Sequence, residues 1–343
     1  DFREMLQKTK PEIVIVGTPD HWHALAAIAA IESGAHVYVE KPIAHTIDEG
    51  KAMVAAARKY DRVVQVGTHR RVSPHNISAM EFLKQGKAGQ ISQVECFVNY
   101  GQGAGEPAAD EEPPKELDWD MWCGPAPLRN YNPQIHPRGF RNFLDYANGT
   151  IADWGIHWFD QVLWWTEEKA PKSIYSAGGK FIRKDNSDAP DTQMAIFDFE
   201  SFTLTWENRR CAPGAHEDHN VGAFFYGTEG TLHLGWIDGW TFYPRKKGDE
   251  IINVKPTLHM PDSQNIKELW ADFMQSIEEK KLPVCDIHTG HLATNMSLLA
   301  MISYKLGRSV EWDSEKEIII ADEEANDYLR REYRGEWVYP EIL

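Results

Sequence analysis

The first ninety residues alternate regularly between short apolar runs and helical segments. The apolar runs cover residues 13–17, 36–39 and 63–67, and residues 22–33 and 47–60 between them have the composition of helices. Strands joined through helices run parallel, because a right-handed crossover returns the chain to the same side of the sheet. The sequence therefore predicts an α/β fold that begins with a parallel sheet.

Each of these apolar runs ends in polar or ionisable residues. Residues 18–23 follow the first run, Glu40-Lys41-Pro42 follows the second, and residues 68–71 follow the third. The carboxyl ends of parallel strands share one edge, and ligands bind at that edge in open sheets. We therefore expect a ligand site there.

The pattern changes near residue 90, where longer alternating strands begin. We expect strands at 91–100, 173–182, 192–199, 201–208, 221–227 and 231–236, and helices at 150–166, 264–280 and 289–306. Hairpin-length connections between several of these strands favour antiparallel pairing. The chain is thus predicted to have two domains, residues 1–90 and residues 91–343, the second an α/β domain with a large, mostly antiparallel open sheet.

Composition excludes several classes of partner. The formal net charge of the 343 residues is −16, which disfavours nucleic acid and anionic membrane surfaces. No apolar run approaches the roughly 20 residues of a spanning helix. Four scattered cysteines support neither a zinc knuckle nor a dense disulfide framework.

One pair of residues predicts acid–base chemistry. Asp153 and His157 are four apart in the expected helix 150–166, so they share a helix face. A carboxylate beside an imidazole orients the ring and supports a proton on it, which suits a general base. The alternative interpretation is an Asp–His pair on the surface of an amphipathic helix.

Lys41 is the third candidate. It follows the second strand, and its bond to Pro42 is a candidate cis peptide that would direct the ammonium over the sheet edge. There it would stabilise negative charge on a reacting hydroxyl. By itself, a lysine after a strand is more often a solvated surface residue.

Two histidine-rich phrases have the residue types of metal ligands. They are His216-Glu217-x-His219 and His288-x-x-His291. Nothing in the sequence brings the two phrases together, so we expect structural or substrate-lining histidines and no metal site.

These motifs together resemble the Gfo/Idh/MocA oxidoreductases, the glucose–fructose oxidoreductase and inositol dehydrogenase family. The resemblance covers essentially the whole chain, and its most specific elements are Glu40-Lys41-Pro42 and Asp153-x-x-x-His157. It implies a Rossmann-type domain that binds NAD or NADP, followed by an α/β domain. It also implies a small-molecule sugar or glycoside substrate and a homodimer or homotetramer.

The resemblance also implies roles for individual residues. His157 would be the base, Lys41 the hydrogen-bonding partner of the substrate hydroxyl, and Asp153 the residue that orients the substrate or the histidine. The residues expected at the cofactor are Thr18, Pro19, His23, Glu40, Lys41, His69 and Arg71. The expected substrate contacts, mostly in the aromatic segment 118–149, are Arg141, Tyr131, His136 and Trp154.

The sequence departs from the family at one place. The glycine-rich phosphate loop is absent, since Gly101-Gln102-Gly103-Ala104-Gly105 precedes acids and prolines instead of a helix. Because residues 1–10 read as a helix already under way, we expect that a first βαβ unit lies upstream; the alternative is a truncated relative that binds a dinucleotide poorly. The residue that selects NAD or NADP, and any signal that distinguishes a cytoplasmic from a periplasmic protein, would lie there.

Three functions remain open on the sequence. The first is oxidation of a secondary hydroxyl of a sugar, cyclitol or glycoside. The second is an NAD-dependent glycosidase that oxidises C3 transiently and eliminates the aglycone, with Tyr131, His136 or His216 as the extra acid/base group. The third is a non-catalytic sugar-binding or assembly protein.

Overall fold

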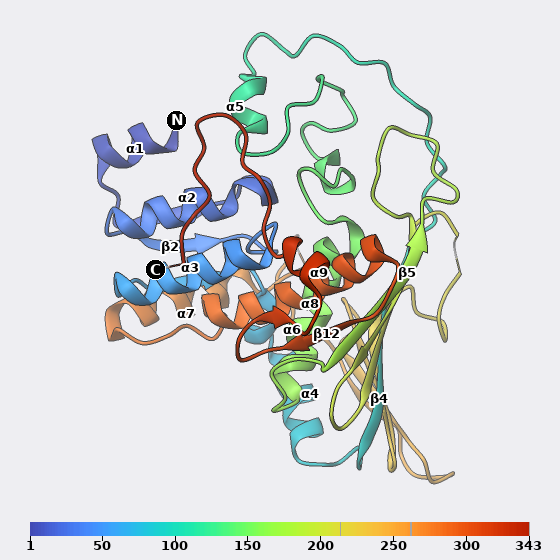
Figure 1. The fold of residues 1–343 in the computed structure, drawn as a ribbon. Coiled ribbons are helices and arrows are strands. Elements are labelled where there is room, and N and C mark those ends of the chain that lie inside the picture. The colour runs from blue at the N-terminus through green and yellow to red at the C-terminus, as the bar shows by residue number, and fades with distance from the viewer. Residues whose placement is uncertain (213, 261–262, 343) are drawn as a thin grey trace.

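A computed structural model describes residues 1–212, 214–260 and 263–342, which are arranged around two sheets (Figure 1). The smaller sheet has the parallel order β1-β2-β3, formed by β1 (Ile13–Val16), β2 (His36–Val39) and β3 (Val64–Val66). Val16 is the register partner of Val39, and Val39 is that of Val66. The three strands therefore end at one edge, as the sequence predicts.

Helices connect and flank this parallel sheet. They are α1 (Phe2–Thr9), α2 (Asp20–Glu32) and α3 (Ile47–Lys59). The next helix, α4 (Pro74–Lys84), follows β3 in the chain but packs Met80 and Leu83 into the core of the larger sheet. The predicted capping box at the start of α3 is present, with the Glu49 carboxylate accepting from the backbone N–H of Thr46 at 3.1 Å. This cap fixes the point at which the loop after β2 ends.

The larger sheet has ten strands in the order β11-β10-β9-β8-β4-β7-β6-β5-β12-β13. The strands are β4 (Ile91–Asn99), β5 (Ser173–Gly179), β6 (Thr192–Asp198), β7 (Thr203–Arg209), β8 (Val221–Gly227), β9 (Gly230–Gly235), β10 (Trp240–Pro244), β11 (Ile252–Val254), β12 (Val310–Asp313) and β13 (Ile318–Ile319). β4 and β7 are parallel, and the other neighbours are antiparallel. The expected fold class is confirmed, although β10 to β13 did not stand out in the sequence.

The main core lies between this sheet and the helices on one of its faces. α6 (Ile156–Trp165) and α8 (Ile287–Leu306) bury large apolar side chains there, among them Trp158, Phe159 and Met301. The predicted helix at 150–166 begins with a wider π turn over Ile151–Gly155 before α6. Wide turns of this kind are often found at functional sites.

Late segments of the chain return to the parallel sheet. α7 (Ile266–Glu279) buries Leu269 and Phe273 against Tyr38, and the N–H of Val66 donates to the carbonyl of Cys285 at 2.8 Å. After α9 (Glu323–Asp327) the C-terminal segment passes beside α5 (Trp119–Cys123) and lies along α2 and α3 (Figure 1). Among the described helices, none has the length and apolar character required to cross a membrane.

Candidate active site

Lys41, directly after β2, is held by the turn that precedes α6. Its Nζ donates to the Asp153 carboxylate at 2.8 Å and to the Asp153 carbonyl at 2.7 Å. The Lys41–Pro42 peptide is cis, as predicted. Arg141 donates from Nε to the same Oδ1 of Asp153 at 3.1 Å. Burial favours a raised pKa for Asp153, but Lys41 and Arg141 outweigh it and lower the pKa, so the carboxylate is ionised.

The sequence left two groups that Asp153 could orient, the substrate and His157. In the described residues no hydrogen bond joins the two side chains, and the carboxylate serves Lys41 and Arg141 instead. Charged donors give the stronger hydrogen bonds to a carboxylate, which explains why the ammonium and the guanidinium occupy it. Asp153 therefore orients the lysine.

His157 lies in α6 with 7% of its surface exposed, among other rings. Its ring centroid is 5.0 Å from that of Trp236, 5.5 Å from that of His69 and 6.3 Å from that of Trp154. Burial, reinforced by the nearby cations Lys41 and Arg70, lowers the pKa of His157 well below its ordinary value. The imidazole is therefore neutral near pH 7, with a buried Nδ1 that has no partner among the described residues, and it is free to accept a proton.

Neighbouring arginines in the short helix His69–Val72 point to different partners. Arg71 donates from Nε to both carboxylate oxygens of Asp160 at 2.9 Å, so its guanidinium is held by α6. Arg70 is 1% exposed and stacks on Trp236 at 3.6 Å from the ring centroid. None of its three side-chain nitrogens has a partner within the described structure, and burial lowers its pKa to about 9. The sequence singled out Arg71 and missed Arg70, because a pair of adjacent arginines carries no signal of which one faces the site.

Asp20 was also missed. It is the first residue of α2, directly after Thr18-Pro19 at the end of β1, and is 5% exposed. Burial raises its pKa to about 7, with Arg141 and Lys41 acting to lower it and Asp153 to raise it. A carboxyl group that changes charge near neutral pH thus lies in the electrostatic field of the Lys41–Asp153 pair.

The residues expected at the cofactor differ in exposure: Thr18 is exposed, whereas His23 is buried. Gly17 and Thr18 are exposed, and a Cβ at Gly17 would meet nothing within 4 Å. His23, in contrast, is buried, with its ring nitrogens 2.7 Å from the Pro42 carbonyl and 2.8 Å from that of Thr18. It ties the loops after β1 and β2 together, which is a structural task.

Glu40 and Pro19 lie at the same sheet edge. The Glu40 carboxylate accepts from the Tyr38 hydroxyl at 3.0 Å, and a Cβ on Gly67 would come within 3.0 Å of it. Pro19 is half-buried immediately before α2. The ends of β1, β2 and β3 therefore meet through close contacts that leave the Gly17–Thr18 side open.

The side chains of the aromatic segment 118–149 pack against one another in a separate hydrophobic cluster. Tyr131 packs edge-on against Trp119 at 5.1 Å, and His136 packs against Trp122 at 5.9 Å. Within the described residues, no hydrogen bond or ring contact joins Tyr131 or His136 to Lys41, Asp153 or His157. Trp154 does contact His157 and, at 4.9 Å, Trp236. Trp236 comes from the turn after β9, and no local pattern in the sequence indicated it.

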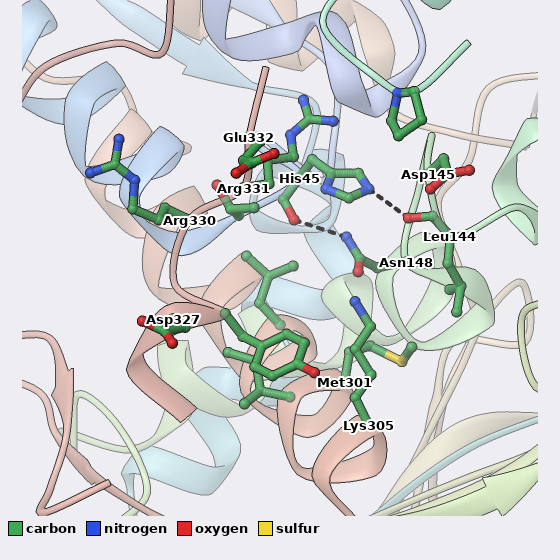
Figure 2. Close-up of a pocket in the computed structure, with 15 residues that line it drawn as sticks. His45, Leu144, Asp145, Asn148, Met301, Lys305, Asp327, Arg330, Arg331 and Glu332 are labelled. Atoms are coloured by element: carbon green, nitrogen blue, oxygen red, sulfur yellow. Dashed lines mark hydrogen bonds between the residues drawn. The ribbon is translucent and has the colours of Figure 1, made fainter. Parts of the chain in front are cut away.

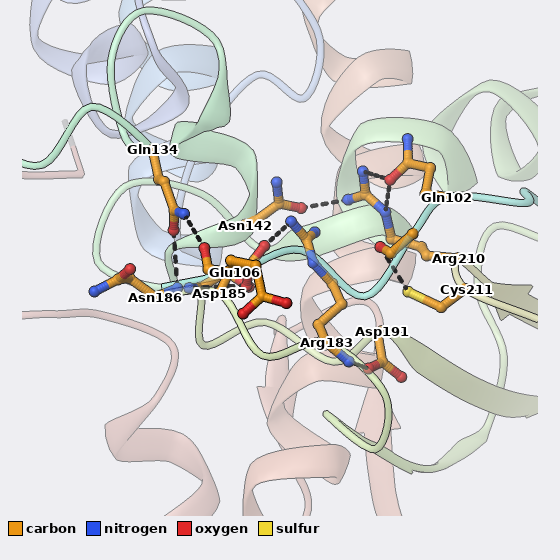
Figure 3. Close-up of polar contacts among 12 residues, drawn as sticks. Gln102, Glu106, Gln134, Asn142, Arg183, Asp185, Asn186, Asp191, Arg210 and Cys211 are labelled. Atoms are coloured by element: carbon orange, nitrogen blue, oxygen red, sulfur yellow. Dashed lines mark hydrogen bonds and ion pairs between the residues drawn. The ribbon is translucent and has the colours of Figure 1, made fainter. Parts of the chain in front are cut away.

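A polar network holds the segment that carries Arg141 (Figure 3). Arg210 donates to Asn142 and, at 2.9 Å, to Gln102, while the carbonyl of Asn142 accepts from the N–H of Asp188 at 3.0 Å. The segments that carry Gln102, Asn142, Asp188 and Arg210 are thereby fixed to one another. Among the described residues, no group of three or more His, Cys, Asp or Glu is placed to hold a metal ion.

The residues at this edge fit the nicotinamide half of a dinucleotide. Gly17 offers open backbone at the end of β1, and the Nδ1 of His157 lacks a partner in the described residues. The chain offers no glycine-rich loop before a helix for the pyrophosphate. The residues at this edge therefore fit the nicotinamide end of the cofactor, where the reaction takes place, and the fit does not extend to the pyrophosphate.

Comparison with sequence families agrees with this geometry. Residues 1–68 match the NAD-binding Rossmann fold of the oxidoreductase family Gfo/Idh/MocA, and residues 91–339 match its C-terminal alpha/beta domain. The chain belongs to the Gfo/Idh/MocA oxidoreductases. Family membership and the nicotinamide cofactor class are thus confirmed, whereas the roles of individual residues and the domain boundary at residue 90 remain predictions.

Several family members resemble the chain in part. Levoglucosan dehydrogenase of Pseudarthrobacter phenanthrenivorans is 36% identical over 91 residues, which are 26% of this chain and 23% of that enzyme. D-glucoside 3-dehydrogenase of Escherichia coli is 21% identical over 330 residues, 91% of this chain and 82% of that enzyme. The match to levoglucosan dehydrogenase and one to the putative oxidoreductase YteT of Bacillus subtilis span only 23% and 35% of those proteins.

Solved structures share the fold. A levoglucosan dehydrogenase in complex with NADH and levoglucosan superposes with a TM-score of 0.69 at 21% identity, covering 91% of this chain and 82% of that one. An oxidoreductase domain protein from Kribbella flavida gives 0.70 at 22% identity, covering 91% and 83%. At these identities the comparison establishes the architecture.

Proposed function

We propose that this chain takes part in the NAD(P)-dependent oxidation of a secondary hydroxyl of a sugar, cyclitol or glycoside. The observation that supports this most strongly is the Lys41–Asp153 ion pair beside a buried, neutral His157 at the sheet edge. The relatives named for levoglucosan and D-glucoside oxidation support a sugar or glycoside as the substrate class. Trp154 and Trp236 offer the aromatic surface that suits the C–H faces of a sugar ring.

In this proposal each group has one task. When bound, the nicotinamide supplies a hydride acceptor for the hydrogen on the substrate carbon. His157 takes the hydroxyl proton, because its imidazole is neutral and its Nδ1 has no partner among the described residues. Lys41 donates a hydrogen bond to the oxygen as negative charge develops on it. Asp153 holds the ammonium in place, and Arg141 holds the Asp153 carboxylate.

The test is the Lys41→Ala variant, assayed for NAD(P)H formation from levoglucosan, methyl glucosides and inositol. Loss of one charge-stabilising donor is expected to lower kcat by about 10²–10³-fold. Lys59→Ala at the end of α3 is the matched control and should retain activity. Circular dichroism and NAD(P)H fluorescence report folding and cofactor binding separately. Full activity in Lys41→Ala would refute the assignment.

One match favours a second candidate function. A glycosyl hydrolase family 109 protein of Shewanella sp. strain ANA-3 is 31% identical over 95 residues of the chain. The same site would then oxidise the sugar transiently and eliminate the aglycone, with His69, in ring contact with His157, as a further acid/base group. Release of an aryl leaving group without net NAD(P)H formation would support it, and net NAD(P)H formation without such release would exclude it.

We also propose that the open face of the large sheet is covered by self-association. Adjacent strands β5 and β6 expose Tyr175, Met194 and Ile196 on that face, at 43%, 57% and 47% of their surfaces. Analytical ultracentrifugation should show a dimer or tetramer, and a monomer at micromolar concentration would contradict the proposal.

A further inference from the structure

A cavity of about 410 Å³ lies outside the catalytic cluster. It is lined by the loop after β2, by part of the aromatic segment, by one side of α8 and by the chain after α9, and Lys41, Asp153 and His157 take no part in the lining. Figure 2 shows Lys305 of α8 pointing toward the hydrogen-bonded pair His45 and Asn148. The volume of the cavity is in the range of small-molecule sites.

Two cationic side chains of the cavity, Lys305 and Arg331, have donors that no partner uses in the described part of the chain. Arg331 is nevertheless ion-paired with Glu49, and Asp145 and Asp188 lie near Lys305. Lys305 makes no ion pair or hydrogen bond in the described part of the chain, and burial lowers its pKa. Arg331 uses Nε and Nη2 on Glu49 and the His21 carbonyl, which leaves its buried Nη1 without a partner there. The acidic groups of the lining are paired, as Asp145 is with Arg129, or exposed, as Asp327 and Glu332 are.

His45 adds an acceptor to these donors. It is 7% exposed, and its Nε2 lies 3.0 Å from the Leu144 carbonyl, to which it donates. Burial, with Arg331 and Lys305 nearby, lowers the pKa of His45 well below its ordinary value, so the ring is neutral. Its buried Nδ1 is then a lone-pair acceptor, and the described structure offers it no donor.

The floor of the cavity is apolar. Leu298, Met301 and Ile302 of α8 are buried beneath these polar groups. A ligand that satisfies the whole lining therefore has a carbon body, an anionic group and a hydroxyl.

We propose that this cavity binds a small hydroxylated organic anion, such as a sugar acid or a sugar phosphate, at a site separate from the catalytic one. The anionic group pairs with Lys305 and Arg331, and a hydroxyl donates to Nδ1 of His45. His45 lies four residues after Lys41 in the same loop, so a bound anion stabilises the loop that carries the proposed catalytic lysine. This inference does not depend on the proposed oxidation.

The test is isothermal titration calorimetry of the folded chain with gluconate, glucose 6-phosphate, glucose and hexanoate. Gluconate or glucose 6-phosphate should bind saturably, and glucose, which lacks the charge, should bind at least about tenfold more weakly. Hexanoate, which lacks hydroxyls, should also bind more weakly. If none of the anions binds saturably to folded protein, the proposal is wrong.

Three variants test whether the anion binds in this cavity or at the catalytic site. Lys305→Met should weaken anion binding about tenfold or more, because a charge-assisted hydrogen bond is lost. Lys84→Met, in the last turn of α4, is the matched control and should bind as the wild type does. Lys41→Met should also retain binding. Loss in Lys41→Met without loss in Lys305→Met would assign the anion to the catalytic site and overturn the proposal.

A fourth variant tests the hydroxyl contact. His45→Phe keeps the ring volume and removes Nδ1, so the preference for gluconate over hexanoate should fall about tenfold. Circular dichroism identifies a failure to fold. An unchanged preference in a folded variant would contradict the role of His45.

Discussion

The charged groups at the sheet edge differ in how they are paired on the two sides of the candidate site. On the side of Lys41, the ammonium and the Arg141 guanidinium both bind the Asp153 carboxylate, and Arg71 is held by Asp160. On the side of His157, the described structure gives no hydrogen-bond partner to Nδ1 of His157, to Nδ1 of His69 or to the guanidinium of Arg70.

This difference separates side chains that are already fixed in position from side chains that are free to bind a ligand. Paired groups are fixed in one geometry before a ligand arrives, whereas buried polar atoms without partners lower their free energy when a ligand or water supplies one. We infer that the Lys41 side is preorganised and that the His157 side receives the reacting groups. The following variants test this contrast, from the largest expected effect to the smallest.

Arg71→Met should be the most destabilising change. It leaves Asp160, which is 1% exposed, without its counter-charge, and breaking a buried ion pair in this way costs about 3–5 kcal/mol. Urea unfolding followed by tryptophan fluorescence measures the loss. The double variant Arg71→Met/Asp160→Leu should recover part of it, and a loss below about 1 kcal/mol in the single variant would show that the pair is not a fixed element.

Asp20→Asn should change how stability depends on pH. Because burial raises the pKa of Asp20 from 3.8 to about 7, the folded chain keeps a proton in this window that the unfolded chain has lost. The free energy of unfolding therefore falls as pH rises, by up to about 1.4 kcal/mol per pH unit. The variant should lack this contribution in unfolding curves between about pH 5 and about pH 7. The exposed Asp249→Asn is the control, and equal slopes in all three proteins would contradict the burial of a protonated Asp20.

His69→Gln should change the pH dependence of the free energy of unfolding in the opposite direction. Burial, with Arg70 and Lys41 nearby, lowers the pKa of His69 from 6.5 to about 3, so between these values the unfolded chain binds a proton that the folded chain does not. The free energy of unfolding thus falls as pH falls below 6.5. Because other buried histidines share this slope, the variant should reduce it by at most about 1.4 kcal/mol per pH unit. An unchanged slope in the same unfolding experiment would mean that His69 is solvated.

Arg70→Met should have the smallest effect on stability. No ion pair is lost, and the methionine retains part of the packing on Trp236, so we expect a change within about 1 kcal/mol of the wild type. Tryptophan fluorescence should change because the stacked guanidinium is gone. A loss as large as that of Arg71→Met would show that Arg70 has a strong partner after all and would remove the contrast between the two sides.

Local sequence patterns predicted the frame of the site well. The strand ends, predicted at residues 17, 39 and 67 and found within one residue of those positions, depend on residues close together in sequence. The capping box at Thr46 and the end of α8 before Gly307 do so as well. Signals of this kind lie within a short stretch of sequence, so they can be recognised before the fold is known. The π turn at Ile151–Gly155 was not predicted, and there a Cβ on Gly155 would come within 2.7 Å of the Phe159 ring.

The sequence by itself determined that Lys41 follows a strand of the parallel sheet and that Asp153 and His157 lie in one helical segment, because strand and helix periodicity is a local property. Only the tertiary structure decided their partners. Asp153 binds Lys41 instead of His157, Arg70 and not Arg71 stacks on Trp236, and Trp236 reaches His157 from a distant turn. Partner choice depends on burial and on competition among charges from remote segments, which no local pattern contains.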